Sequence, residues 1–167
     1  MIDLPVSKGL SSSAAMCVAI LAAIDLINRF PNAKQQDLQN ILEYVSESET
    51  LTFYANMAYV GERKELRINC GQMDQYALAF VGILHIDCRE EPAKVYHLEP
   101  KLNLPIVIGD TMQPKDTQKI LGWLGERFRT KEPSFFEGMK NIVRIIEEAK
   151  EKLKKLNPDR KILRINE

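Results

Sequence analysis

The sequence holds little of what several protein classes require. Among its 167 residues are three cysteines, without a Cys-x-x-Cys pair, and two histidines, which excludes a disulfide framework and argues against a zinc site. Because 23 Lys+Arg balance 23 Asp+Glu, a nucleic-acid partner held by a basic surface is not expected. An apolar content of 45% at zero net charge excludes disorder and provides the core of one domain, or of parts of two. This composition fits a reducing cytoplasm.

A long membrane-spanning run is also missing. The most apolar stretch, residues 14–24, is shorter than the roughly 20 residues that cross a bilayer, and Asp25 ends it. The N-terminal residues include Asp3 and lack the basic start and clear cleavage site of a signal peptide. We therefore expect neither a membrane association nor export.

Local patterns predict an α+β chain. Hydrophobic periodicity and helix-ending residues predict helices over 14–30, 37–59, 73–80 and 117–128, and a last amphipathic helix over 137–156. β-Branched and apolar runs predict strands over 82–88, 95–98 and 104–109, and residues 1–6 resemble the end of another strand. Residues 7–13 form a small-residue turn, and 61–71 a polar connection.

The turn before the first long helix has the composition of an anion site. Gly9 and three serines, Ser11, Ser12 and Ser13, precede a helix whose first N–H groups lack intrahelical partners. Small residues let a phosphate approach those groups, and serine hydroxyls bind phosphate or Mg²⁺. The alternative is that the serines only cap the helix. The residues alone leave these two interpretations even, and the turn is not a Walker A loop.

Three segments resemble one enzyme family. Residues 5–15, Pro-x-x-x-Gly-Leu-Ser-Ser-Ser-Ala-Ala, resemble the second signature motif of the GHMP kinases, such as galactokinase, homoserine kinase, mevalonate kinase and phosphomevalonate kinase. Residues 70–75, Cys-Gly-Gln-Met-Asp-Gln, resemble a galactokinase-type segment, and residues 85–89 resemble the strand that follows it. Residues 110–117 are more weakly similar to a Thr-x-x-x-Arg/Lys-x-Thr stretch. The motifs follow the family order over about residues 1–125.

The resemblance implies a GHMP kinase-like α+β fold, truncated at both ends. Residues 1–100 would supply the later part of the N-terminal, ATP-binding domain, which is ribosomal protein S5 domain 2-like. Residues 101–167 would supply the junction strand and the start of the ferredoxin-like C-terminal domain. Two incomplete domains leave apolar faces uncovered, so we expect a homo-oligomer or a complementary segment that covers them.

The resemblance also implies a site for ATP and Mg²⁺. The ATP and phosphate contacts would come from the serine turn and its flanks: Pro5, Lys8, Gly9, Leu10, Ser11, Ser12, Ser13 and Ala14. Ser13 and Glu62 would be the metal ligands, since Mg²⁺ takes a few hard oxygen ligands together with phosphates. The alternative for Glu62 is a solvated surface acid in a charged run.

Asp74 would be the catalytic base, which orients the acceptor hydroxyl for phosphoryl transfer. Gly71, Gln75, Lys115 and Thr117 would join it in binding the substrate. The alternatives are an N-cap role for Asp74, and a surface turn at 115–117 with Asp116 or Thr117 as N-cap. Neither histidine is expected at the site.

The function expected from this resemblance is transfer of the γ-phosphoryl group of ATP to a hydroxyl of a sugar. Two alternatives remain, a mevalonate-pathway kinase of the same family and a catalytically inactive remnant that serves as a binding or dimerisation module. For the sugar kinase and for the mevalonate-pathway kinase, the expected partner is a small-molecule alcohol.

Overall fold

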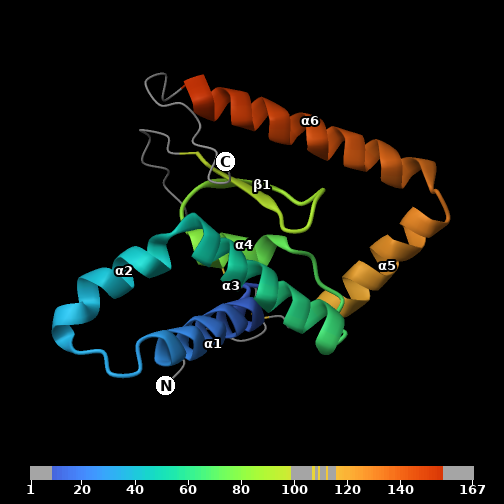
Figure 1. Ribbon diagram of the computed structural model, residues 1–167. Coiled ribbons are helices and arrows are strands. Elements are labelled where there is room, and N and C mark those ends of the chain that lie inside the picture. The colour runs from blue at the N-terminus through green and yellow to red at the C-terminus, as the bar shows by residue number, and fades with distance from the viewer. Residues whose placement is uncertain (1–8, 99–106, 108, 110–111, 113–115, 156–167) are drawn as a thin grey trace.

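The computed structural model describes residues 9–98, 107, 109, 112 and 116–155, apart from the side chain of Lys154. Its elements run in the order α1 (Ser12–Arg29), a 3₁₀ turn (Gln35–Asp37), α2 (Leu38–Ser46), α3 (Ser48–Val60), a π-helical turn η2 (Gly61–Glu65), α4 (Met73–Phe80), β1 (Leu84–Asp87), β2 (Lys94–His97), α5 (Thr117–Arg129) and α6 (Pro133–Lys155) (Figure 1). The described part is thus helical with a small two-stranded sheet, which is consistent with an α+β chain.

The core lies where α3 and α4 meet the strands. β1 and β2 pair antiparallel in the register Leu84 opposite His97 to Asp87 opposite Lys94. The buried cluster joins α3, α4 and this hairpin, and consists of Ala55, Tyr76, Phe80, Ala93 and Val95. Tyr76 adds a polar tie, because its hydroxyl accepts a hydrogen bond from the Ala93 N–H at 3.0 Å. The hairpin therefore fixes the orientation of α4.

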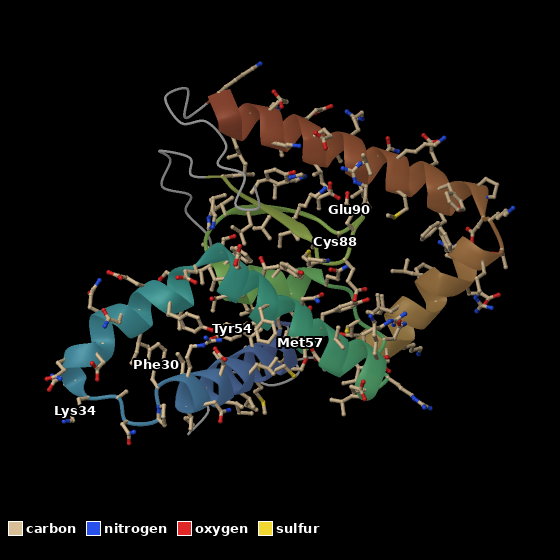
Figure 2. All side chains as sticks on the ribbon, in the orientation of Figure 1. Phe30, Lys34, Tyr54, Met57, Cys88 and Glu90 are labelled. Carbon is tan, nitrogen blue, oxygen red and sulfur yellow. The ribbon has the colours of Figure 1, made fainter. Side chains whose placement is uncertain are left out.

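Helix α1 packs on the side of α3 and α4 away from the strands (Figure 1). Its Asp25 carboxylate accepts hydrogen bonds from the hydroxyls of Tyr44 on α2, at 2.7 Å, and Tyr54 on α3, at 2.8 Å. Tyr54 lies between the ribbons of α3 and α1 in Figure 2. These bonds, first that of Tyr44 and then that of Tyr54, lower the pKa of Asp25. They anchor α1 to both neighbouring helices.

The single helix predicted over 37–59 is wrong, because the chain forms two helices there. Glu47 has φ −63° and ψ 134°, an extended conformation that interrupts the helical hydrogen bonds between α2 and α3. The break turns α2 away from α3 (Figure 1), yet one tyrosine from each still reaches Asp25. Tertiary hydrogen bonds thus prevail over a continuous helical period.

Most other predicted elements are confirmed with small shifts at their ends. The short helix over 73–80 has the predicted bounds, and those over 14–30, 117–128 and 137–156 correspond to α1, α5 and α6. The strands predicted over 82–88 and 95–98 are β1 and β2. The strand end at 1–6 lies outside the described residues. So does most of the strand over 104–109, in which Val107 and Gly109 are described and have no regular structure.

Two helices present exposed apolar faces. On α1 the exposed large residues are Met16, Ile20, Ile24 and Ile27, and on α6 they include Phe136, Met139, Ile142, Val143 and Ile146. By length and composition α1 meets the requirements of a membrane-crossing helix. Those are weak grounds, since core helices of soluble proteins and signal sequences meet the same requirements. Both faces are suited to covering by a further segment or chain.

Candidate functional site

The serine turn holds an unusual backbone at the start of α1. Gly9 and Ser11 both adopt left-handed conformations, with φ 76° and 56°. Ser11 occupies the N-cap position, but its side chain makes no capping hydrogen bond. No acidic residue stands in the first turn of α1 either. The capping interpretation of Ser11 is therefore wrong, and the partial positive charge of this helix end faces an adjoining cavity.

That cavity, of about 690 Å³, gathers residues from four separate parts of the chain. The serine turn, the π-helical turn with the segment after it, the start of α4 and the start of α5 form its walls. The lining residues are Gly9, Ser11, Ser12, Ser13, Ala14, Glu62, Ile68, Asn69, Cys70, Asp74, Gln75, Asp116, Thr117 and Gln118. The fold thus brings together segments more than a hundred residues apart in sequence.

Glu62 is buried, with 2% of its surface exposed, although its sequence neighbours Arg63, Lys64 and Glu65 are exposed. The alternative of a solvated surface acid is therefore wrong. The π-helical turn that extends α3 directs this side chain inward, where Gln75 Nε2 donates a hydrogen bond to Glu62 Oε2 at 2.6 Å. Among the described residues no lysine or arginine forms an ion pair with Glu62, so its negative charge has no counterion there.

Asp74 stands in the first turn of α4 and lines the same cavity. The N-cap of α4 is Gln72, so the capping alternative for Asp74 is wrong. Within the described part of the chain the structure records no hydrogen bond to the Asp74 carboxylate. This carboxylate can therefore accept a proton or a hydrogen bond from a molecule in the cavity.

The start of α5 closes another wall of the cavity. Asp116 caps the helix, accepting from the Lys119 N–H at 3.0 Å, as one alternative for this turn predicted. Gln118 forms two hydrogen bonds with the backbone of Asn69, at 3.1 and 3.3 Å. These two hydrogen bonds hold the start of α5 against Asn69, at a cavity whose other lining residues lie between 9 and 75.

Several lining residues were not predicted from the sequence: Ile68, Asn69, Cys70, Asp116 and Gln118. Cys70 belongs to the segment that resembles galactokinases, which was a usable signal. The pairing of Gln118 with the Asn69 backbone has no signature in local sequence. Burial, and after it the charge of Glu62, raises the pKa of the Cys70 thiol and of the Cys17 thiol. Both cysteines are therefore protonated at neutral pH and are poor nucleophiles.

The structure places most of the predicted site residues in this cavity. Those that line it are Gly9, Ser11, Ser12, Ser13, Ala14, Glu62, Asp74, Gln75 and Thr117. Leu10 and Gly71 belong to the same segments without lining it. Pro5, Lys8 and Lys115 lie outside the described residues.

The galactokinase-like segment 85–89 lies elsewhere. Asp87, at the end of β1, accepts hydrogen bonds from the Arg89 guanidinium, one of them at 2.8 Å from Nε. The Arg89 hydrogen bonds hold the pKa of Asp87 well below its usual range. Neither side chain lines the cavity, so this pair organises the β1–β2 turn.

The donor set for a metal is small. No group of three or more His, Cys, Asp or Glu side chains among the described residues is arranged to hold a metal ion. Glu62 supplies one carboxylate, and the cavity adds serine hydroxyls. Such a set fits Mg²⁺, which commonly keeps waters and is bound by one or two carboxylates plus substrate phosphates.

Comparison with known families gives one match, over the N-terminal half of the chain. Residues 2–82 match the family model of the GHMP kinases N terminal domain, so this part of the chain is similar to a domain of ATP-dependent kinases. The match includes the serine turn, Glu62, Asp74 and Gln75. No curated protein and no solved structure matches the chain.

Proposed function

We propose that this chain carries the phosphate, metal and base residues of an ATP-dependent kinase that phosphorylates a hydroxyl of a sugar. The observation that supports the proposal is the single cavity in which the N-terminus of α1, the buried Glu62 and the carboxylate of Asp74 meet. Phosphoryl transfer requires these three functions together, because catalysis rests on positioning and charge stabilisation.

The serine turn is the phosphate side of the site. Left-handed residues at Gly9 and Ser11 curve the backbone before α1, and the hydroxyls of Ser12 and Ser13 line the cavity. Backbone N–H groups at the helix start, its dipole and two hydroxyl donors all favour an anion. ATP would place its phosphates here.

Glu62 and Ser13 are the proposed Mg²⁺ ligands. A buried carboxylate is stable only when it is paired, hydrogen-bonded or bound to a metal, and Glu62 has one hydrogen bond among the described residues. When bound, Mg²⁺ would neutralise charge on the transferred phosphoryl group. Glu62 would hold that charge in a fixed place beside the serine turn.

Asp74 is the proposed base on the acceptor side. Its carboxylate lines the cavity without a hydrogen bond to other described residues, so it can accept one from the acceptor hydroxyl. Thr117 lies on the wall formed by α5. Lys115 is proposed as a further substrate contact from the family resemblance alone. The sugar is proposed from the resemblance of residues 70–75 and 85–89 to galactokinases, and mevalonate is the alternative acceptor within the family.

The experiment that tests this function measures ADP release from ATP-Mg²⁺ with a panel of acceptors that includes galactose and mevalonate. Asp74→Asn should lower the turnover rate by at least about 10²-fold, the typical contribution of a general base, with unchanged ATP affinity. The control is Asp37→Asn, since Asp37 lies away from the cavity and accepts a bond from the Lys34 N–H. Turnover of the Asp74 variant within a few-fold of wild type would refute the base assignment.

A second candidate is supported by the exposed apolar faces of α1 and α6. A chain without turnover on any acceptor could still act as a binding or dimerisation module through these faces. ADP release with none of the acceptors, together with self-association in light scattering, would favour this candidate over the kinase.

A further inference from the structure

Gln75 is the most buried polar residue in the wall of the cavity. It stands in the first turn of α4 with 1% of its surface exposed. Its amide nitrogen Nε2 donates to Glu62 Oε2 at 2.6 Å, a short and charge-assisted hydrogen bond. Because its amide donor is engaged by the carboxylate, this side chain is well placed to act on Glu62.

The orientation of the Gln75 amide is determined by the carboxylate. Its carbonyl oxygen Oε1 is buried without a hydrogen-bond partner in the described structure. An unpaired buried acceptor typically costs about 1–3 kcal/mol, so the site needs a reason to retain it. The reversed amide would place Oε1 against the Glu62 oxygen, two acceptors in contact, which is worse. The unpaired carbonyl is the consequence of keeping the donor on Glu62.

Among the described residues, Gln75 makes the hydrogen bond that the Glu62 side chain receives. The structure records no hydrogen bond to its Oε1 among the described residues, and no cation is paired with it there. Gln75 therefore holds one carboxylate oxygen of a side chain that lines the cavity, and the other oxygen has no hydrogen bond to a described residue.

We propose that Gln75 is a positioning residue that fixes the Glu62 carboxylate for a divalent cation bound together with a nucleotide. The proposal rests on the proposed function, and it reassigns Gln75 from substrate contact to support of the metal ligand. Hydrogen bonds to ligating carboxylates typically contribute 10–100-fold to metal affinity. This positioning role requires that the Gln75 side chain donate a hydrogen bond from Nε2 and that it carry no charge.

The test compares ADP binding with and without Mn²⁺, measured by isothermal titration calorimetry on the whole chain. Gln75→Met keeps the length and volume of the side chain but removes the donor. It should weaken Mn²⁺-ADP binding at least about 10-fold while leaving metal-free ADP binding unchanged. The matched control is Gln72→Met, because Gln72 donates to the Glu90 carbonyl and does not line the cavity. The control should bind Mn²⁺-ADP like wild type.

A double-mutant cycle separates positioning from general damage. In a Glu62→Gln background, Gln75→Met should cause no further loss of the Mn²⁺-dependent part of ADP affinity. If Gln75→Met does not fold by circular dichroism, Gln75→Asn is measured in the same way, because it keeps the amide but withdraws it from Glu62.

The outcomes distinguish this inference from the proposed function. Equal Mn²⁺-ADP affinity of wild type and the Gln75 variant would overturn the inference and leave the kinase proposal standing. An equal loss of ADP affinity with and without Mn²⁺ would also overturn it, because that pattern indicates structural damage. Wild-type protein that binds no ADP under either condition would overturn the proposed function and the inference together.

Discussion

Replacing Ser12 and Ser13 by alanine distinguishes a phosphate-binding turn from a helix cap. Loss of a serine N-cap typically lowers the free energy of unfolding by about 1 kcal/mol. The N-cap position belongs to Ser11, whose side chain makes no capping bond, and both replaced residues lie within α1. The double alanine variant should therefore change the free energy of unfolding by less than about 0.5 kcal/mol.

The expected effect on nucleotide binding is much larger. Both hydroxyls line the cavity at the start of α1, and a hydrogen bond to a charged group contributes about 1.5–3 kcal/mol. Loss of even one such bond weakens binding about tenfold, since 1.4 kcal/mol corresponds to a factor of ten. The double variant should thus bind ADP-Mg²⁺ between about 10-fold, for one lost bond, and about 10⁴-fold, for two, more weakly, as measured by calorimetry.

The matched control is Ser46→Ala, which removes a hydroxyl that donates to the Leu42 carbonyl at 2.7 Å, away from the cavity. Its nucleotide affinity should equal that of wild type. Unchanged affinity in the Ser12/Ser13 variant would refute the phosphate role. A loss of stability near 1 kcal/mol accompanied by unchanged affinity would instead restore a capping role.

Further predictions concern stability, the α5 wall and association. Tyr44→Phe/Tyr54→Phe should lower the free energy of unfolding at pH 7 by about 1–3 kcal/mol. Because the tyrosines lower the pKa of Asp25, their contribution to stability is present above the unfolded pKa and is lost as pH falls through the lowered, folded pKa. The difference from wild type in urea titrations should therefore narrow as the solution is acidified below the ordinary pKa of an aspartate. Val81→Gly should raise the free energy of unfolding by about 1 kcal/mol, because the exposed Val81 has φ 55° and ψ 159°, a conformation that suits glycine. The thermal midpoint should rise accordingly, and an unchanged midpoint would contradict this. Gln118→Ala should raise the KM for the acceptor severalfold without lowering kcat, and an unchanged KM would exclude a role of the α5 wall. Light scattering should give a mass above 19.1 kDa at micromolar concentration, and a stable monomer would contradict covering of the apolar faces by a second copy.

Local sequence predicted the elements whose determinants are local. The bounds of α4 and the positions of α1, α5 and α6 follow from hydrophobic period and from helix-ending residues. The break at Glu47 could not be predicted, because residues 37–59 carry a continuous helical pattern and the break serves tertiary bonds to Asp25. The hydrophobic period of a segment does not predict which of its side chains will hydrogen-bond to a carboxylate on a distant helix.

The candidate site was predictable in part, and through resemblance more than through pattern. The serine turn has the small residues that an anion site requires, and Asp74 stands in a recognisable segment. Glu62 lies among charged residues that pattern reasoning assigns to the surface. Its burial depends on a π-helical turn and on Gln75 thirteen residues later. The wall formed by Gln118 depends on a contact across 49 residues, which no local rule supplies.

The two charged features of the cavity together restrict what can fill it. The N-terminus of α1 favours an anion, whereas the buried Glu62, with no cation beside it in the described part, favours a cation. A phosphate alone satisfies the helix end and adds repulsion toward Glu62. A divalent cation alone finds no set of three acidic, histidine or cysteine ligands among the described residues. A metal–nucleotide complex satisfies both features at once, because its phosphates face the helix end and complete the coordination of the metal. Cation and nucleotide should therefore each increase the affinity for the other, by the same factor in either order of addition.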